Sequence, residues 1–239
     1  MLGTFVKLYS PALIEILGFS GFEFIVVDME HSSIDFSEAE NLVRAAKVAN
    51  IEVILRIPYA REEHVLHTLD SGAIGVQIPG LTSAEDTENF TKNGKYYPLG
   101  NRGLSFNQRS AKYGFAEKNE YIEKSNREGI FVIHIENKEM VDEVEKLCKN
   151  PLIDVLFIGP MDLSQSYHTI GQPQSEPVRH AIDKVISMAK KYDKTVGIFA
   201  GNTEEAKKYR DMGINYIVCS SDIGHFASGA KKVVADFKK

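Results

Sequence analysis

The sequence predicts an α/β protein folded as a single (β/α)₈ TIM barrel over residues 1–239. Short runs rich in β-branched and apolar residues recur along the chain, and amphipathic stretches fill the intervals between them. The length of 239 residues is also typical of one barrel of this kind. A doubly wound open sheet is the alternative, but the glycine-rich first turn of such sheets is missing.

The predicted strands are nearly continuous in apolar residues, which is typical of parallel strands buried on both faces. In chain order they are TFVKL (4–8), EFIVVD (23–28), EVILRI (52–57), IGVQIP (74–79), IFVIHIE (130–136), DVLFIG (154–159), TVGIFA (195–200) and YIVCS (216–220). Each is followed by a segment that can form a helix, so the elements add up to an eight-stranded barrel.

The helical patterns carry recognisable ends. Residues 37–49 place apolar side chains at intervals of three and four, with Ser37 as a candidate N-cap. Residues 203–213 end on Gly213, where a helix C-terminus favours glycine. The segment 96–128 has no clear strand and many polar and glycine residues, and a connection of this length is expected to be functional or part of an interface.

Composition excludes several classes of partner. A hydrophobic content of 43% with 26% charged residues is that of a globular protein able to bury a large core. The net charge of −5, with lysines and arginines scattered among acids, argues against a nucleic-acid partner. No apolar run is long enough to cross a membrane, and the N-terminus lacks the pattern of a signal peptide. Cys148 and Cys219 fit no zinc spacing, so we expect reduced, structural cysteines in a cytoplasmic protein.

Polar side chains with chemical function follow several predicted strands at their carboxyl ends, where the active site of an α/β barrel lies. They are Asp28, Glu30 and His31 after the second strand, Arg56 in the third, Gln77 in the fourth, His134 and Glu136 in the fifth, and Asp162 after the sixth. Asp28 and Asp162 could instead cap turns or helices, and His31 could simply be solvated. Arg56 and Glu136 are harder to explain structurally, because a charged residue at the end of an apolar strand needs a partner of opposite charge.

The residue types at this rim suit metal-assisted enolate chemistry. Two carboxylates without a histidine–cysteine cluster favour a hard divalent ion such as Mg²⁺ or Mn²⁺, with Co²⁺ or Zn²⁺ as alternatives. Such an ion has room for the carboxylate and keto oxygen of a 2-oxo acid, while Arg56 would neutralise the enolate and His31 would act as the base or activate a water. A Schiff-base aldolase is the rival; it needs a lysine inside the barrel, and Lys7 is the one candidate in a strand interior.

At these residues the sequence resembles the HpcH/HpaI aldolase family, which are metal-dependent class II pyruvate aldolases of the 2-dehydro-3-deoxyglucarate and 4-hydroxy-2-oxo-heptanedioate type. The matching stretches are GFEFIVVDMEHSSID (21–35), VILRIP (53–58), LDSGAIGVQIPG (69–80), YYPLGNRG (96–103), IHIEN (133–137) and DVLFIGPMDLS (154–164). The resemblance implies reversible cleavage of a 4-hydroxy-2-oxo acid to pyruvate and an aldehyde. It also implies a homohexamer, a trimer of dimers whose subunits exchange their C-terminal helix.

The resemblance also implies roles for individual residues. It makes Glu136 and Asp162 the metal ligands, Arg56 the group that holds the pyruvate keto oxygen, His31 the catalytic histidine, Asp70 its paired acid, and Asp28 a neighbour of the metal-bound waters. The substrate carboxylate is expected at the backbone of Gly159, Pro160 and Met161, with Asp162 and His134 also in contact with the substrate. The stretches NRG (101–103) and RSAKYG (109–114) match a region near the site mouth and the subunit contacts.

One residue departs from the family pattern. Most relatives carry glutamine two residues before the metal glutamate, and here that position is His134. Strand alternation places His134 and Glu136 on the same face, toward the barrel interior. His134 is therefore either a hydrogen-bonding substitute for the amide or a third metal ligand, which would shift the preference towards Mn²⁺, Fe²⁺ or Zn²⁺.

Two other functions compete with the aldolase interpretation. A CoA-ester lyase of the citrate lyase β-subunit type shares the barrel and the metal chemistry, but it needs a basic pocket for the CoA phosphates that the sequence does not indicate. A non-catalytic barrel that binds a metabolite is the other alternative, and the joint presence of His31, Arg56, Glu136 and Asp162 disfavours it.

Overall fold

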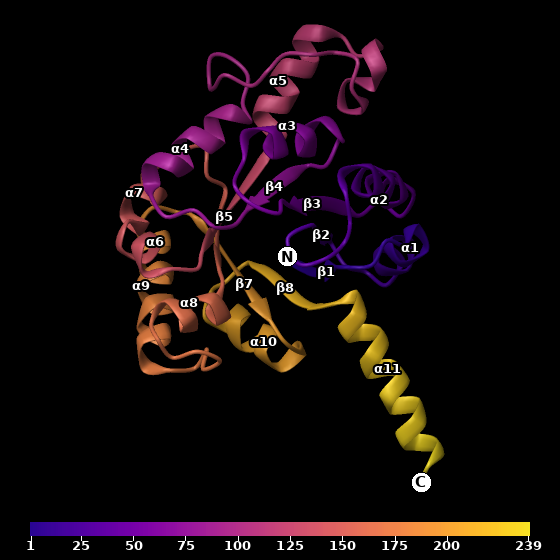
Figure 1. Cartoon of the computed structure of the whole chain (residues 1–239), viewed down its shortest axis with the longest axis vertical. Coiled ribbons are helices and arrows are strands. Elements are labelled where there is room, and N and C mark those ends of the chain that lie inside the picture. The colour runs from indigo at the N-terminus through magenta and orange to yellow at the C-terminus, as the bar shows by residue number, and fades with distance from the viewer.

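A closed barrel of eight parallel strands forms the centre of the computed structural model, which describes residues 1–239 (Figure 1). The strands are β1 (Leu2–Val6), β2 (Phe24–Asp28), β3 (Glu52–Arg56), β4 (Gly75–Ile78), β5 (Ile130–Ile135), β6 (Val155–Ile158), β7 (Thr195–Ala200) and β8 (Tyr216–Ser221). They follow one another around the barrel in chain order, and β1 pairs with β8 to close it. The predicted single-domain (β/α)₈ barrel is therefore confirmed.

Helices surround the barrel on its outside (Figure 1). They are α1 (Pro11–Phe19), α2 (Phe36–Val48), α3 (Glu62–Asp70), α4 (Ala84–Asn93), the 3₁₀ helix η1 (Arg109–Gly114), α5 (Lys118–Glu128), α6 (Lys138–Asp142), α7 (Val144–Lys149), α8 (Pro160–Ser166), α9 (Glu176–Lys191), α10 (Thr203–Asp211) and α11 (Asp222–Phe237). None of these helices has the length and apolar character needed to cross a membrane.

Several element ends differ from the sequence prediction by one or two residues, and two of these differences concern named residues. The first strand ends at Val6 rather than Leu8, so Lys7 follows the strand and is not inside it. The cap of α2 is Asp35, whose side chain accepts from the Glu38 N–H while Glu38 accepts from the Asp35 N–H. This reciprocal capping box makes the prediction of Ser37 as the cap wrong. The predicted end of α10 is confirmed, since Gly213 takes a φ of +93° just beyond it.

Strand alternation determines which side chains enter the barrel. The interior is filled by a cluster that includes Phe5, Val26, Ile54, Val132 and Phe157. Counting two residues on from each along its strand gives Lys7, Asp28, Arg56, His134 and Gly159, because every second residue of a strand faces the same side. The interior face thus changes from apolar to polar at the carboxyl ends of β1, β2, β3 and β5, and β6 is followed there by a glycine.

The long connection between β4 and β5 contains no strand, as predicted, but it holds a helix that the sequence did not single out. After η1 the chain forms α5, and buried Tyr96, Ala111 and Tyr121 build a small core of their own. Lys95 is buried beside it and donates to the carbonyls of Asn126 and Gly129, which lie just before β5. This segment therefore packs at the end of the barrel where the strands begin.

The last helix projects away from the barrel (Figure 1). Its first residue, Asp222, accepts from the backbone N–H groups of Lys7 and Leu8, which ties the start of α11 to the end of β1. Beyond that point the helix exposes apolar side chains, and Phe226, Val233 and Phe237 are 75%, 70% and 92% accessible. Spacings of seven and four residues place these three on one side of the helix.

Candidate active site

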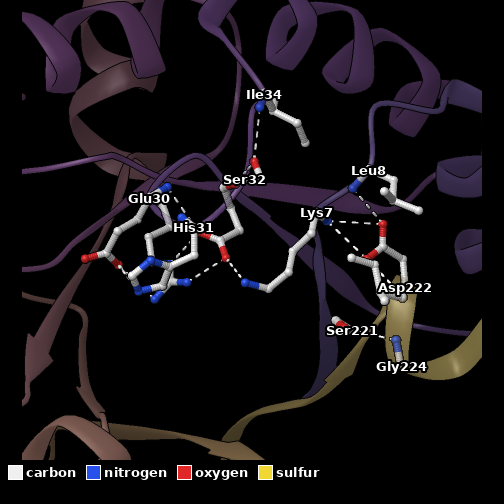
Figure 2. A network of polar contacts seen from close by, with 12 residues as sticks. Lys7, Leu8, Glu30, His31, Ser32, Ile34, Ser221, Asp222 and Gly224 are labelled. Atoms are coloured by element: carbon white, nitrogen blue, oxygen red, sulfur yellow. Dashed lines mark hydrogen bonds and ion pairs between the residues drawn. The ribbon is translucent and has the colours of Figure 1, made fainter. Parts of the chain in front are cut away.

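A network of buried charges occupies the ends of β1, β2 and β3. The Asp28 carboxylate accepts from Arg56 Nε at 2.9 Å and Arg56 Nη2 at 2.6 Å, a bidentate arrangement that fixes the guanidinium. Lys7 Nζ donates to the same carboxylate at 2.5 Å, and Glu30 lies 2.9 Å from Arg56 Nη1. Figure 2 shows the Lys7 side chain extending toward the turn that carries Glu30 and His31. Arg56 also lies over the ring of Phe5, with 4.6 Å between Cζ and the ring centroid.

Asp28 organises the turn after β2 as well as Arg56. Its Oδ1 accepts from the backbone N–H groups of Glu30 at 3.1 Å and His31 at 3.0 Å, and Ser32 Oγ donates to its carbonyl oxygen. With these and the three side-chain bonds, both oxygens of Asp28 are already used by donors of the chain. Asp28 therefore holds Arg56 and the turn of His31 in place. Its predicted position near metal-bound waters stays a prediction.

The charges around Asp28 change its acidity. Burial raises the pKa of Asp28, but the hydrogen bonds and charge of Arg56 together with the Lys7 ammonium lower it to about 2. At the same rim, burial raises the pKa of Glu30, and the negative charge of Glu136 adds to that rise. Asp28 therefore remains ionised at neutral and mildly acidic pH.

We expect this network to make the stability of the protein sensitive to acid. Because the folded-state pKa of Asp28 lies below its ordinary value of 3.8, the ionised carboxylate stabilises the fold above pH 4, and this contribution of about 2 kcal/mol is lost as the pH falls towards 2. Urea unfolding of the wild type and Asp28→Asn at pH 7, 4 and 3 should show a difference in unfolding free energy that narrows below pH 4. A difference that stays constant with pH would contradict the assigned role.

A second polar group joins the ends of β4 and β5. His134 is 2% exposed, its Nδ1 lies 2.7 Å from Glu136 Oε2, and its Nε2 lies 2.6 Å from the Gln77 amide nitrogen. The other Glu136 oxygen accepts from the Gly80 N–H at 2.6 Å. Burial raises the pKa of Glu136, but the hydrogen bond and charge of His134, the Gly80 N–H and the charge of Arg56 bring it below its ordinary value.

The carboxylates of Glu136 and Asp162 converge on the space beside Gly159. A Cβ atom built on Gly159 would lie 3.2 Å from Asp162 Oδ2 and 3.8 Å from Glu136 Oε2, so only glycine leaves this space open. Partial burial and the nearby charge of Glu136 raise the pKa of Asp162. Two carboxylates held close enough to disfavour each other's charge are a donor pair that suits a hard cation.

No group of three or more His, Cys, Asp and Glu side chains is arranged to hold a metal ion. A cation between Glu136 and Asp162 would therefore take its other ligands from water and substrate, as Mg²⁺ commonly does. The oxygen donors and the open space beside Gly159 fit this kind of ion. A site of closed, all-protein coordination does not fit the residues present.

The first turn of α8 offers backbone donors next to this pair. Gly159 precedes the helix and Pro160 opens it, so the unpaired N–H groups of the first turn are those of Met161 and Asp162. Pro160 belongs to the predicted carboxylate-binding segment but has no N–H group. It therefore helps to set the helical geometry and cannot donate a hydrogen bond to the substrate. The Asp162 side chain lies in this turn and does not cap the helix.

The structure separates His31 from its predicted partner. His31 lies on the turn after β2 with its side chain 64% exposed, and its nearest acidic group is Glu30, with 3.9 Å between Nε2 and Oε2. Asp70 is the last residue of α3, and a helix that follows a strand returns to the opposite end of the barrel. There Asp70 accepts from Arg102 at 2.6 Å. The predicted His31–Asp70 pair is therefore not formed within one chain.

Sequence reasoning left two members of the site without a role. The sequence indicates Lys7 only as a candidate Schiff-base lysine, and its pairing with Asp28 depends on β1 ending at Val6. Gln77 was noted at the rim, and the register of β4 with β5 brings it to His134. The alternation indicates both, since Lys7 lies two residues beyond interior Phe5 and Gln77 lies two residues beyond Gly75 of β4.

Comparison with known proteins relates the chain to aldolases. A family model described as HpcH/HpaI aldolase/citrate lyase matches residues 1–229. The chain is 29% identical over 238 residues to a 5-keto-4-deoxy-D-glucarate aldolase of Klebsiella pneumoniae, covering 100% of this chain and 92% of that protein. It is 30% identical over 229 residues to a hydroxypyruvate/pyruvate aldolase of Paraburkholderia phytofirmans, covering 93% of this chain and 87% of the relative.

A solved structure shows the same architecture. A protein of the HpcH/HpaI aldolase/citrate lyase family from Burkholderia cenocepacia superposes with a TM-score of 0.95 at 27% sequence identity. The match covers 100% of this chain and 95% of that one. The similarity therefore extends over the whole barrel and includes every element that contributes to the site.

Proposed function

We propose that this chain, which belongs to the HpcH/HpaI aldolase/citrate lyase family as its motifs predicted, cleaves a 4-hydroxy-2-oxo acid reversibly to pyruvate and an aldehyde. The reaction would depend on a divalent metal ion. The chain is related over its full length to carbon–carbon lyases of the aldolase type. The observation that carries this proposal is the convergence of Glu136 and Asp162 on the space beside Gly159. The charge of Arg56 lies at the same rim, where it helps to lower the pKa of Glu136 and opposes the rise in the pKa of Asp162.

Glu136 and Asp162 would hold the ion, with Mg²⁺ or Mn²⁺ preferred and Co²⁺ or Zn²⁺ as alternatives. When bound, the ion would supply Lewis-acid stabilisation of negative charge on the substrate oxygens. The charge of the site supports a divalent cation: the four carboxylates of Asp28, Glu30, Glu136 and Asp162 outnumber the two cations Lys7 and Arg56 by two.

The residues of the chain then divide the remaining tasks. His31, exposed at the mouth, would take the proton of the 4-hydroxyl group as the C3–C4 bond breaks and the aldehyde departs. The electron pair of that bond passes into the enolate of pyruvate, whose oxygen would lie against the Arg56 guanidinium that Asp28 holds in place. The free N–H groups of Met161 and Asp162 would receive the substrate carboxylate.

The Schiff-base alternative is less well supported. It requires a lysine amine that is free to attack a carbonyl, and Lys7 Nζ is bound to the buried Asp28 carboxylate at 2.5 Å. No specific contact in the site favours a CoA ester.

We also propose a small-molecule 2-oxo acid as substrate. A cytoplasmic location is proposed as well, and it agrees with the two buried cysteines, which are both free.

The reaction is tested by mixing the protein and Mg²⁺ or Mn²⁺ with a panel of 4-hydroxy-2-oxo acids and following pyruvate with lactate dehydrogenase and NADH. We expect pyruvate release that a chelator stops and that the added ion restores. Activity that survives the chelator and is trapped by borohydride would instead support a Schiff base. Cleavage of a hydroxyacyl-CoA in place of the oxo acids would support the CoA-ester lyase.

We propose that the active form is a homo-oligomer, a hexamer built as a trimer of dimers. Two observations support this: α11 exposes an apolar side that the chain itself does not cover, and His31 and Asp70 occupy opposite ends of the barrel. A His31–Asp70 pair could form only if the Asp70 end of one copy meets the His31 end of another. Exchange of α11 between the two subunits of a dimer would cover Phe226, Val233 and Phe237.

Placing charge on the exposed side of α11 should break this assembly. We expect the double variant Phe226→Asp/Val233→Asp to elute as a smaller species than the wild type in size-exclusion chromatography with light scattering, because two carboxylates cannot be buried in an apolar contact. Lys231→Asp, on the other side of the helix, should keep the wild-type mass. An unchanged mass for the double variant would show that this side of α11 takes no part in assembly.

A further inference from the structure

Among the polar groups of the site, Gln77 and His134 have no part in the mechanism above, and yet they are fully buried behind a proposed metal ligand. A buried polar side chain costs free energy unless its hydrogen bonds are made, so a chain of two such residues calls for an explanation. Both come from the interior face of the barrel, one from β4 and one from β5.

The two nitrogens of the His134 ring are both occupied. Nδ1 lies 2.7 Å from Glu136 Oε2, and Nε2 lies 2.6 Å from the Gln77 amide nitrogen. The ring is also stacked on Phe157, with 5.1 Å between centroids and 27° between planes. To bind a cation directly, the ring would have to give up one of these hydrogen bonds.

His134 Nδ1 is the donor to Glu136 for either orientation of the Gln77 amide. If the amide nitrogen donates to Nε2, the proton of a neutral ring is on Nδ1 and is donated to Glu136. If the amide is turned over, Gln77 Oε1, which otherwise has no partner, accepts from Nε2–H. Nδ1 then donates to Glu136 when the ring carries its second proton, and the adjacent carboxylate favours that cationic form. In both cases the His134 Nδ1–H points to the carboxylate.

Glu136 is thus fixed from two directions. His134 donates to Oε2, and the Gly80 N–H just after β4 donates to Oε1 at 2.6 Å. Each oxygen keeps lone pairs that are not used by these bonds. A carboxylate fixed in this way needs little reorganisation to bind an ion, which is the usual effect of hydrogen bonds behind a metal ligand.

We propose that Gln77 and His134 are positioning residues that orient Glu136 for the metal ion, and that His134 is not itself a ligand. This inference rests on the proposed function, since it assigns Glu136 to the metal. It resolves the two interpretations of His134 that the sequence left open in favour of the hydrogen-bonding one. Gln77 is the outer member of the pair and acts through His134.

The test measures Mn²⁺ binding to the metal-free protein by calorimetry for four forms of the chain. His134→Phe keeps an aromatic ring against Phe157 but removes both hydrogen bonds, and we expect it to weaken binding about 10- to 100-fold. His134→Gln can still donate to Glu136 and should stay within about threefold of the wild type. His180→Phe, on the exposed side of α9, is the matched control and should not change the affinity.

Two further measurements separate positioning from ligation. Gln77→Leu should weaken binding less than His134→Phe, and adding it to His134→Phe should cause no further loss, because the two residues act in series. Mn²⁺ bound to wild-type protein with ¹⁵N-labelled histidine should show no directly coordinated histidine nitrogen by electron–nuclear double resonance. A coordinated nitrogen that is lost in His134→Gln would overturn the inference.

The outcomes distinguish this inference from the proposed function. If the wild type binds Mn²⁺ and His134→Phe binds it equally well, the positioning role is refuted and the aldolase proposal stands. If the wild type binds no divalent ion, the proposed function fails, and the inference fails with it. A loss in His134→Phe that His134→Gln restores supports both, because a change of packing alone would not be rescued by an amide.

Discussion

Replacing Arg56 with methionine should lower the rate of pyruvate enolisation by about 10²-fold or more, because the guanidinium is the group placed to stabilise the enolate oxygen. The same change should destabilise the fold by about 3–5 kcal/mol, since it leaves buried Asp28 and half-buried Glu30 without their main partner. The bidentate contact with Asp28 holds Arg56 at the end of β3, so one side chain serves both the enolate and the buried network.

Two control variants separate the catalytic loss from the loss of stability. Arg56→Lys keeps the positive charge but cannot bridge both oxygens of Asp28, so it should recover stability in part and remain poorly active. Arg179→Met changes an exposed arginine in α9 and should alter neither property. Folded Arg56→Met protein that exchanges the protons of pyruvate at the wild-type rate would exclude a catalytic role for this residue.

Replacing either converging carboxylate should abolish the response to metal. For the wild type, an ion at 100 times its Kd should raise the free energy of unfolding by about 2.7 kcal/mol, and Glu136→Gln or Asp162→Asn should lose most of that increase. Asp162→Asn should not destabilise the metal-free protein, because the raised pKa of Asp162 means that its charge is unfavourable in the fold. Thermal or urea unfolding with and without Mn²⁺ measures both effects.

Asp183→Asn is the matched control for these variants, since Asp183 is an exposed acid of α9. It should keep the full stabilisation by Mn²⁺. A Glu136→Gln or Asp162→Asn protein that is still stabilised as strongly as the wild type would place the ion elsewhere. Such a result would leave the barrel and the family assignment intact but would remove the assigned ligands.

The alternation of the strands explains why so much of the site could be predicted. Residues two positions beyond buried interior side chains, such as Asp28 after Val26 and Arg56 after Ile54, must point into the mouth of the barrel. Glu136 and Asp162 follow adjacent strands, so their proximity also follows from chain order around the barrel. These inferences need only a period of two and the parallel arrangement.

Other features depend on distances that periodicity does not contain. The pairing of Gln77 with His134 depends on the register between β4 and β5, and the pairing of Lys7 with Asp28 depends on β1 ending at Val6. The place of Asp70 in the fold is a further case, and its pairing with His31 stays a prediction that needs two copies of the chain. Its position at the end of α3, bound to Arg102, is a property of the helix length and of the long connection before β5.

In the proposed reaction this barrel forms the enolate of pyruvate with the help of a divalent ion. Enolate formation can be tested without knowing the aldehyde. Pyruvate is incubated with the protein in D₂O, and loss of the methyl proton signal is followed by NMR. We predict exchange with Mg²⁺ or Mn²⁺, none after chelation, and none with Glu136→Gln. Absence of exchange with every common divalent ion, from protein shown to be folded, would contradict the proposed chemistry.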